Sequence, residues 1–189
     1  MTKKITLVHG RFQPLHNGHL EDYIMKAVEI SNCDYLYVGI TNADESHIKP
    51  SVSNTERSKP QNNPLNYVER LEMIKLALIE RGLSREKFEI IPFPINRKDL
   101  LPSYHINNVK YYLTIFDQWG KDKFADLISL YGEENVEEIP TEKDDNNRIK
   151  ATDIRNKMKE SKEWENLVPK SVANYLKDNK LVEKIIKLR

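Results

Sequence analysis

A short stretch near the N-terminus constrains this chain most strongly. Residues 5–20 read Ile-Thr-Leu-Val-His-Gly-Arg-Phe-Gln-Pro-Leu-His-Asn-Gly-His-Leu. An apolar, β-prone run ends at a turn that contains Gly10 and Pro14, and His16 and His19 follow just before an amphipathic pattern. Backbone N–H groups at a turn and at a helix N-terminus attract anions, and imidazoles three residues apart share one face of a helix. The stretch therefore predicts a strand, a turn and a helix around a phosphate site.

Residues 10–19 resemble the signature of the HxGH nucleotidyltransferase superfamily. The similarity is greatest to the archaeal-type nicotinamide mononucleotide adenylyltransferases, in which the run G-R-F-Q-P-x-H-x-G-H is characteristic. The resemblance implies that His16, His19 and Arg11 act in catalysis. It also implies nucleotide or phosphate contacts from Gly10, Phe12, Gln13 and Gly18. The alternative interpretation is structural: the glycine and the proline turn the chain, and the two histidines pack or face water.

The composition excludes several other classes of protein. The 189 residues suffice for one domain with a small appendage and a substantial core. A formal net charge of +1 gives no reason to expect bulk binding to nucleic acid or membranes. Cys33 is the only cysteine, which excludes an intrachain disulfide and a cysteine-based zinc cluster. No apolar run approaches the roughly 20 residues of a membrane span, so we expect a soluble, cytoplasmic protein.

Apolar, β-prone segments alternate with helical patterns along most of the chain. Strands are predicted at 5–8, 34–40, 88–95, 111–116 and 136–139, and helices at 19–31, 66–81 and 121–131. The alternation predicts an α/β fold of the doubly wound (Rossmann-like) type, with a five-stranded parallel sheet and helices on both faces. Ligands of such folds bind at the carboxyl ends of the strands, where the strand order switches.

The expected domain organisation follows from the same pattern. Residues 1–158 are expected to form the α/β nucleotidyltransferase domain. Residues 159–189 show helical periodicity divided at Pro169, which predicts a C-terminal helical extension. The extension either packs on the domain or forms an oligomer interface, and the sequence favours neither.

A segment in the middle of the chain also matches the adenylyltransferases. Residues 63–74 resemble their N-P-F-T-x-x-E-R-x-x-M-I run, although Leu65 replaces an aromatic residue and Asn66 replaces threonine. Asparagine caps a helix at least as well as threonine does, so the fold argument is unaffected. Glu69 and Arg70 either form a buried structural pair or orient substrate, and Arg70 is a possible acceptor contact.

A second signature begins about 130 residues after the first. Residues 148–158 read Arg-Ile-Lys-Ala-Thr-Asp-Ile-Arg-Asn-Lys-Met, which resembles the family motif I-S-x-T-x-I-R. The resemblance implies that Thr152, Arg155 and a helix N-terminus hold the β and γ phosphates. Lys150 stands where serine is expected, and it either binds phosphate as a point charge or points away. An ordinary capped amphipathic helix is the structural alternative.

Two further regions contain candidate contacts. Residues 42–62 form a long polar loop after the second strand, where His47 and Arg57 are possible acceptor or loop contacts. Trp119 follows the fourth strand and either stacks on a flat ring of the substrate or packs in the core. The segment 96–110 matches the family at no particular residue, which leaves the acceptor open.

The reaction that the resemblance implies is transfer of a nucleoside monophosphate from a nucleoside triphosphate to a small phosphorylated acceptor, with release of pyrophosphate. ATP and nicotinamide mononucleotide, giving NAD, are the first candidates. The alternative is a cytidylyltransferase, or another nucleotidyltransferase, with a different phosphate or phosphonate acceptor. A non-catalytic nucleotide-binding protein is the third possibility.

The cofactor expected for this reaction is Mg²⁺, bound through the oxygens of the triphosphate. The sequence shows no dedicated carboxylate cage for it, and no residue is predicted as a metal ligand. The expected partners are the triphosphate and the small acceptor. Neither nucleic acid nor a membrane is expected, and a homo-oligomer is possible.

Overall fold

The molecule is built on one parallel β-sheet. The computed structural model describes residues 3–44, 46, 48, 58–141 and 147–188. The strands are β1 (Ile5–Gly10), β2 (Tyr35–Ile40), β3 (Phe88–Pro92), β4 (Val109–Leu113) and β5 (Val136–Glu138). They pair in the order β3-β2-β1-β4-β5, and each observed pair is parallel. The prediction of a five-stranded parallel sheet is confirmed.

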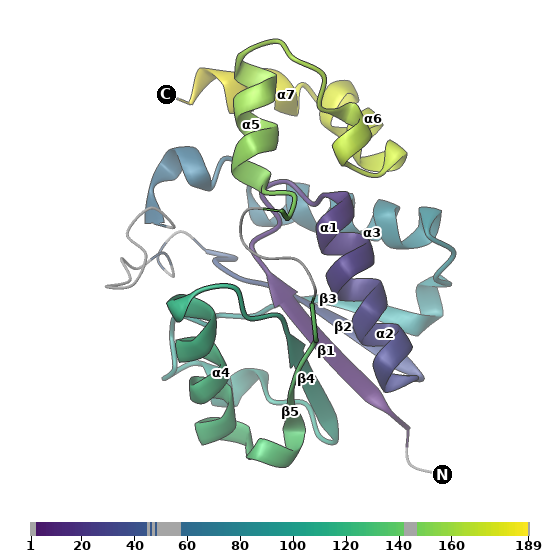
Figure 1. Ribbon diagram of the computed structural model, residues 1–189, viewed down its shortest axis with the longest axis vertical. Helices are drawn as coiled ribbons and strands as arrows, with labels where there is room; N and C mark the ends of the chain where they lie inside the picture. The colour runs from purple at the N-terminus through teal and green to yellow at the C-terminus, as the bar shows by residue number, and fades with distance from the viewer. Residues whose placement is uncertain (1–2, 45, 47, 49–57, 142–146, 189) are drawn as a thin grey trace.

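Helices cover both faces of this sheet (Figure 1). The first is α1 (Asn17–His19), which continues through a π-helical stretch (Leu20–Met25) into α2 (Lys26–Ser31). The others are α3 (Tyr67–Glu80), α4 (Gln118–Tyr131), α5 (Ala151–Lys159), α6 (Lys170–Asp178) and α7 (Leu181–Lys187). Short 3₁₀ turns occupy Pro60–Asn62, Arg85–Lys87, Leu101–Tyr104, Glu133–Asn135 and Glu165–Leu167. This is the predicted doubly wound α/β fold.

Adjacent residues of β1 supply two different hydrophobic cores. Val8 packs in the cluster under α1, α2 and α3, which includes Ile24 and Ile74. Leu7 packs in the cluster under α4, which includes Phe93 and Leu127. Side chains alternate between the faces of a strand, so a strand that is covered on both faces reads as a continuous apolar run.

The central position of β1 determines where a ligand can bind. β1 pairs with β2 on one side and with β4 on the other, and Gly10 lies opposite Ile40 at the carboxyl end. The chain leaves β1 for helices on one face and leaves β4 for α4 on the other face. The crevice between the ends of β1 and β4 is therefore the switch point at which ligands of such sheets bind.

Several predicted boundaries are wrong. Strand β4 begins at Val109 and ends at Leu113, whereas the sequence predicted 111–116, because Val109 already pairs with Ile5 while Thr114 onwards leaves the sheet. Strand β3 likewise ends at Pro92 rather than at residue 95. The first helix begins at Asn17, two residues before its prediction, because the His16 side chain caps it.

The C-terminal segment packs on the rest of the chain. Helix α6 lies against α3 and α7 lies against α5 (Figure 1). Val172, Leu176 and Ile185 belong to the same buried cluster as the residues under α3. Pro169 is the N-cap of α6, as a helix divided at this proline predicts, but a short 3₁₀ turn precedes it where the sequence predicted a helix. The two helices of the extension, α6 and α7, are separated after Asp178 instead. In the described part of the chain, no helix is long and apolar enough to cross a membrane.

Candidate active site

A cavity of about 380 Å³ lies at the carboxyl ends of β1 and β4. Its walls come from the turn after β1, the first turn of α1, the segment after β4 and the start of α5. Ten of the residues that the sequence singled out line it: Gly10, Arg11, Phe12, Gln13, His16, Gly18, His19, Trp119, Lys150 and Thr152. The fold thus brings the first and second signatures together around one space.

His16 is held in one orientation by the helix that it starts. Its backbone is extended (φ −140°, ψ 170°), and its Nδ1 accepts a 3.1 Å hydrogen bond from the backbone N–H of His19. Burial, followed by the charge of Arg148, lowers the pKa of His16 to about 3. A neutral imidazole that accepts at Nδ1 carries its proton on Nε2, so His16 can donate one hydrogen bond from that atom.

His19 stacks directly on His16. The ring centroids are 3.6 Å apart with an interplanar angle of 20°, and the ring of Phe12 meets His19 edge-on at 5.2 Å. Burial lowers the pKa of His19 well below its ordinary value, and His16, Arg148 and Arg11 add to this effect. Its Nδ1 is enclosed and has no hydrogen-bond partner among the described residues. At neutral pH both signature imidazoles are therefore uncharged.

The two glycines of the signature leave room for these rings. A Cβ on Gly10 would lie 2.8 Å from the ring of Phe12, and a Cβ on Gly18 would lie 3.2 Å from Nδ1 of His16. Residues of ordinary size at these positions would displace an aromatic side chain of the pocket. The glycines serve the packing of the site as well as the turn.

Arg70 anchors the turn from behind. Its side chain is 2% exposed, and its guanidinium donates to four backbone carbonyls: those of Arg11 (3.0 Å), Thr41 (2.7 Å), Asn42 (2.7 Å) and Asn66 (3.2 Å). Burial lowers its pKa to about 10, so the group is still charged at neutral pH. One side chain thus joins the segment after β1 to the segment after β2.

Arg155 anchors the same turn from α5. It is 3% exposed, and its guanidinium donates to the carbonyl of Gln13 (2.6 Å), to Oδ1 of Asn62 and to the hydroxyl of Thr152 (3.2 Å). Burial lowers its pKa to about 10 as well. Among the described residues, the two buried arginines Arg70 and Arg155 both bind carbonyls of the signature turn.

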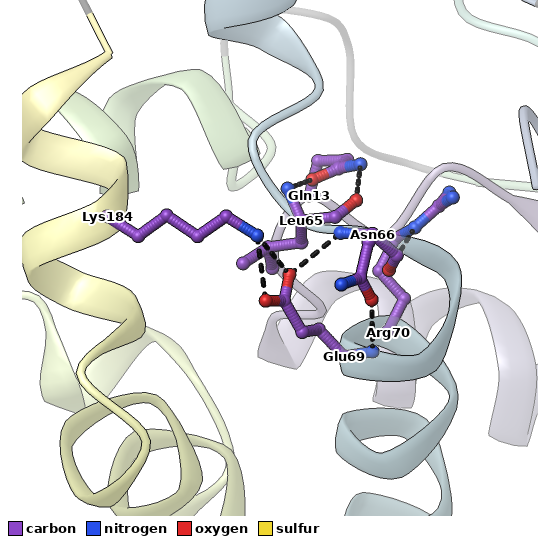
Figure 2. Close-up of polar contacts among 6 residues, drawn as sticks. All are labelled: Gln13, Leu65, Asn66, Glu69, Arg70 and Lys184. Atoms are coloured by element: carbon purple, nitrogen blue, oxygen red, sulfur yellow. Dashed lines mark hydrogen bonds and ion pairs between the residues drawn. The ribbon is translucent and has the colours of Figure 1, made fainter. Parts of the chain in front are cut away.

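The side chain of Gln13 adds a third attachment (Figure 2). Its Nε2 donates to the carbonyl of Leu65, and the N–H of Leu65 donates to its Oε1, both at 2.8 Å. Both polar atoms of the buried amide are therefore satisfied by the segment that enters α3. Such two-way pairing fixes the turn more tightly than a single bond does.

Of the predicted contact residues, two do not line the cavity and two lie outside the described part of the chain. Arg155 and Arg70 are not among the residues that line the cavity. The guanidinium of Arg70 is taken up by four backbone carbonyls, and that of Arg155 by the Gln13 carbonyl and the side chains of Asn62 and Thr152. The motif comparison could not reveal this, since it fixes residue types and not the direction of a side chain. His47 and Arg57 lie outside the described residues.

The sequence analysis missed several residues of the cavity wall. Arg148, the residue before the second motif, lines the cavity and lies over the ring of Phe116 at 4.5 Å. Thr114 and Phe116 line it because β4 ends earlier than predicted. The rule that ligands bind beyond strand ends would have pointed to both had the end of β4 been placed correctly. No sequence signal singled out Arg148.

His9, at the end of β1, also lines the cavity. Its ring stacks on Phe93 at 5.2 Å, and its Nε2 is enclosed without a hydrogen-bond partner among the described residues. Burial, followed by the charge of Lys123, lowers its pKa to about 4. A third uncharged imidazole therefore borders the site.

The start of α5 contributes the donor groups of the second signature. Lys150 occupies the N-cap position with extended backbone and makes no side-chain capping bond. Lys150 and Thr152 both line the cavity, as does the intervening Ala151. The positive end of this nine-residue helix and the charges of Arg11, Arg148 and Lys150 give the cavity a strongly positive wall.

The few carboxylates of the cavity wall suit a metal ion that is bound mainly by the phosphates of a substrate. Among the described residues, no group of three or more His, Cys, Asp or Glu could hold a metal ion. Asp22 and Asp117 are the carboxylates of the wall, and Asp117 already accepts from the N–H of Gly120 at 2.8 Å. Mg²⁺ keeps several waters and commonly binds through substrate phosphates, which does not require a protein cage.

Comparison with known proteins agrees with this geometry. Residues 7–157 match the model of a family described as cytidylyltransferase-like. A phosphonoformate cytidylyltransferase of Streptomyces viridochromogenes is 36% identical over 179 residues, which cover 95% of this chain and 94% of that protein. A nicotinamide-nucleotide adenylyltransferase of Thermococcus kodakarensis is 35% identical over 179 residues, which cover 93% of this chain and 84% of that protein.

A solved structure shares the fold. The bifunctional NMN adenylyltransferase/ADP ribose pyrophosphatase of Francisella tularensis superposes with a TM-score of 0.66 at 18% identity. The match covers 98% of this chain and 53% of that one, so the chain spans about half the length of that protein. At this identity, the similarity concerns the fold alone.

Proposed function

Because this chain belongs to the cytidylyltransferase-like family and is a nucleotidyltransferase, we propose that it transfers the nucleoside monophosphate of a triphosphate to a small acceptor bearing a phosphate or phosphonate. The first substrate pair that we propose is ATP with nicotinamide mononucleotide, which gives NAD and pyrophosphate. The identity of 35% over 179 residues with the Thermococcus adenylyltransferase supports this pair.

One observation carries the proposal. Two uncharged, stacked imidazoles line a cavity whose other groups include three cationic side chains, Arg11, Arg148 and Lys150. Neutral imidazoles donate hydrogen bonds without titrating near neutral pH, and cations hold a polyphosphate. Hydrogen-bond donors and charges fixed in advance around a phosphoryl group are what such transfers require.

The proposed step is a displacement at the α-phosphorus. An oxygen of the acceptor phosphate or phosphonate forms a new bond to this phosphorus, and the bond from it to the bridging oxygen of the β-phosphate breaks. The electron pair leaves with pyrophosphate. The attacking oxygen is already ionised at neutral pH, so the site needs no general base, and the rate comes from alignment and charge neutralisation.

The residues of the cavity divide the work. Nε2 of His16 and the ring of His19 donate to oxygens of the α and β phosphates. Arg11 and Arg148 neutralise charge on the α-phosphate and on the acceptor. Lys150 and Thr152, at the positive end of α5, hold the leaving pyrophosphate. Arg70 and Arg155 act indirectly, because they fix the turn that presents Arg11.

Mg²⁺ is the cofactor that we propose, carried by the triphosphate. When bound, it neutralises part of the charge on the phosphate oxygens. Asp22, a carboxylate of the cavity wall, would help to hold the ion that the triphosphate carries. A cytoplasmic location, a homo-oligomer and the absence of nucleic-acid partners stay predictions.

A second substrate pair has independent support. The phosphonoformate cytidylyltransferase aligns over 94% of its own length, against 84% for the Thermococcus adenylyltransferase. Lys150, which stands where the adenylyltransferase motif has serine, adds a cation to the cavity. CTP with a small phosphonate acceptor is therefore the second candidate.

The test is a matrix of the four nucleoside triphosphates against nicotinamide mononucleotide and phosphonoformate, with Mg²⁺ present and pyrophosphate release measured. Turnover with ATP and nicotinamide mononucleotide supports the first pair. Turnover only with CTP and phosphonoformate replaces it by the second pair. No release with any combination would contradict transfer to either acceptor.

A further inference from the structure

The C-terminal helices touch both elements that hold the signature turn. Helix α6 packs on α3, which carries Arg70, and α7 packs on α5, which carries Arg155. The two arginines bind carbonyls at Arg11 and Gln13, only two residues apart. Any shift of α3 relative to α5 would therefore pull on the turn between these two carbonyls.

A polar chain links α7 directly to the start of α3 (Figure 2). Nζ of Lys184 lies 2.7 Å from each carboxylate oxygen of Glu69. The same carboxylate accepts from the N–H of Asn66 at 2.8 Å, and the Asn66 side chain accepts from the N–H of Glu69 at 2.9 Å. This reciprocal pair is a capping box, which fixes the first turn of a helix.

The capping box adjoins the groups that hold the turn. Leu65, one residue before Asn66, makes the two-way bond with Gln13. Arg70, one residue after Glu69, donates to the carbonyls of Asn66 and Arg11. Figure 2 shows the contacts with Gln13, Asn66 and Glu69 gathered at the N-terminus of α3, with Lys184 reaching them from α7. The described residues thus form an unbroken polar path from the C-terminal helix to the turn.

We propose that Lys184 and Glu69 are positioning residues through which the C-terminal helices hold the signature turn in its catalytic geometry. The inference rests on the proposed function, and it gives the extension a part in catalysis besides packing. Neither residue lines the cavity, so both act through Arg70 and Leu65.

The burial of the pair sets the size of the effect. The Glu69 side chain is 17% exposed and that of Lys184 is 39% exposed, so the charges are only partly screened. Such a pair contributes modestly on its own. Because the loss of the pair is transmitted to the turn, we expect kcat to fall about three- to tenfold.

The variants separate positioning from simple attachment. Lys184→Met removes the charge and keeps an unbranched apolar stem, and Lys184→Arg restores a cation. Glu69→Gln keeps a residue that can complete the capping box and weakens the pairing with Lys184. Lys187→Met, an exposed lysine on the same helix, is the matched control.

Two readouts are measured on the full chain. The first is kcat and KM for the substrate pair that the matrix identifies. The second, which needs no activity, is deuterium uptake by mass spectrometry in the peptide spanning residues 9–16 of the free protein. The positioning role predicts a lower kcat with faster uptake in Lys184→Met and Glu69→Gln, and rescue in Lys184→Arg. Lys187→Met should match the wild type.

The double variant tests whether the pair acts as a unit. If it does, Glu69→Gln/Lys184→Met should lose no more than the larger single loss. Wild-type uptake and wild-type kcat in Lys184→Met would overturn the inference. If the matrix detects no turnover, the proposed function fails, but the uptake comparison still decides whether Lys184 holds the turn.

Discussion

The guanidinium of Arg155 donates a 2.6 Å hydrogen bond to the carbonyl of Gln13, a residue 142 positions earlier in the chain. The bond joins the second signature of the sequence to the first. The sequence predicted that Arg155 holds a phosphate, but a side chain that makes this bond holds the turn instead. The two signature segments are therefore held together by a direct hydrogen bond.

Arg155→Met should destabilise the fold. It removes three hydrogen bonds of a charged group and leaves the buried carbonyl of Gln13 without its partner, so we expect a loss of about 1–3 kcal/mol in the free energy of unfolding. Urea unfolding measures it. A variant of wild-type stability with only a higher KM for the triphosphate would return Arg155 to direct phosphate binding.

Arg148→Met should give the opposite pattern. Arg148 lies on the cavity wall over Phe116, so its loss should change stability by no more than about 0.5 kcal/mol. The negative charge of the transition state would lose the stabilisation that one cation provides, so kcat/KM should fall about 10²-fold. Steady-state kinetics beside urea unfolding of the same sample checks both. Unchanged kinetics would remove Arg148 from the mechanism.

His16→Asn separates the two jobs of that histidine. Asparagine is among the best N-cap residues, so the bond to the N–H of His19 can be replaced and stability should stay within about 0.5 kcal/mol of wild type. The donor at Nε2 is lost, and kcat should fall about 10²- to 10³-fold. His16→Ala, the comparison variant, should lose the cap as well, at about 1 kcal/mol. Full activity of His16→Asn would contradict the donor role.

Gly18→Ala should maintain or improve stability and harm catalysis. Alanine is favoured over glycine inside a helix by up to about 1 kcal/mol. The added methyl group, however, would lie 3.2 Å from Nδ1 of His16, so the ring must shift by a few tenths of an ångström. We expect a melting temperature equal to or above that of wild type and a kcat about tenfold lower. A parallel fall of both quantities would show that the glycine is needed for the backbone instead.

Acid should weaken the fold through the buried imidazoles. His16 and His9 have folded-state pKa values of about 3 and 4, whereas unfolded histidine titrates near 6.5. Between these pH values the unfolded chain binds more protons than the folded protein does. The free energy of unfolding is therefore at its full value above about pH 6.5 and falls as the pH drops towards 4. Each histidine contributes at most about 1.4 kcal/mol per pH unit. Urea unfolding at pH 7, 6 and 5 should show a shallower loss in His16→Asn than in wild type, and equal slopes would refute it.

The sequence predicted the sheet well because both faces of each strand are buried. Short continuous apolar runs such as the one around Val8 are typical of strands that are covered on both faces, and this pattern can be read from the local sequence. Strand ends were harder: Thr114 and Phe116 are as β-prone as their neighbours, yet they leave β4 to line the cavity. Only the tertiary fold determines where pairing stops.

Part of the candidate site could likewise be predicted from the sequence and part could not. The motifs identified His16, His19 and Lys150 as residues of one cavity, because the spacing of a turn and of a helix start is written in the sequence. They could not show that Arg70 and Arg155 bind the carbonyls of the signature turn instead of lining that cavity. Each arginine binds backbone carbonyls of the signature turn, and any residue type could supply a carbonyl, so no residue pattern reveals these bonds.

The most direct test of the account follows the α-phosphorus itself. The wild-type protein is incubated with Mg²⁺, the acceptor identified by the matrix and its triphosphate labelled with ³²P at the α-position, and the products are separated by chromatography. The account predicts that the label moves into the acceptor product while the released pyrophosphate carries none, and that His19→Ala slows this transfer about 10²- to 10³-fold. Label that stays in free nucleotide, or equal transfer by His19→Ala, would contradict the displacement proposed for this cavity.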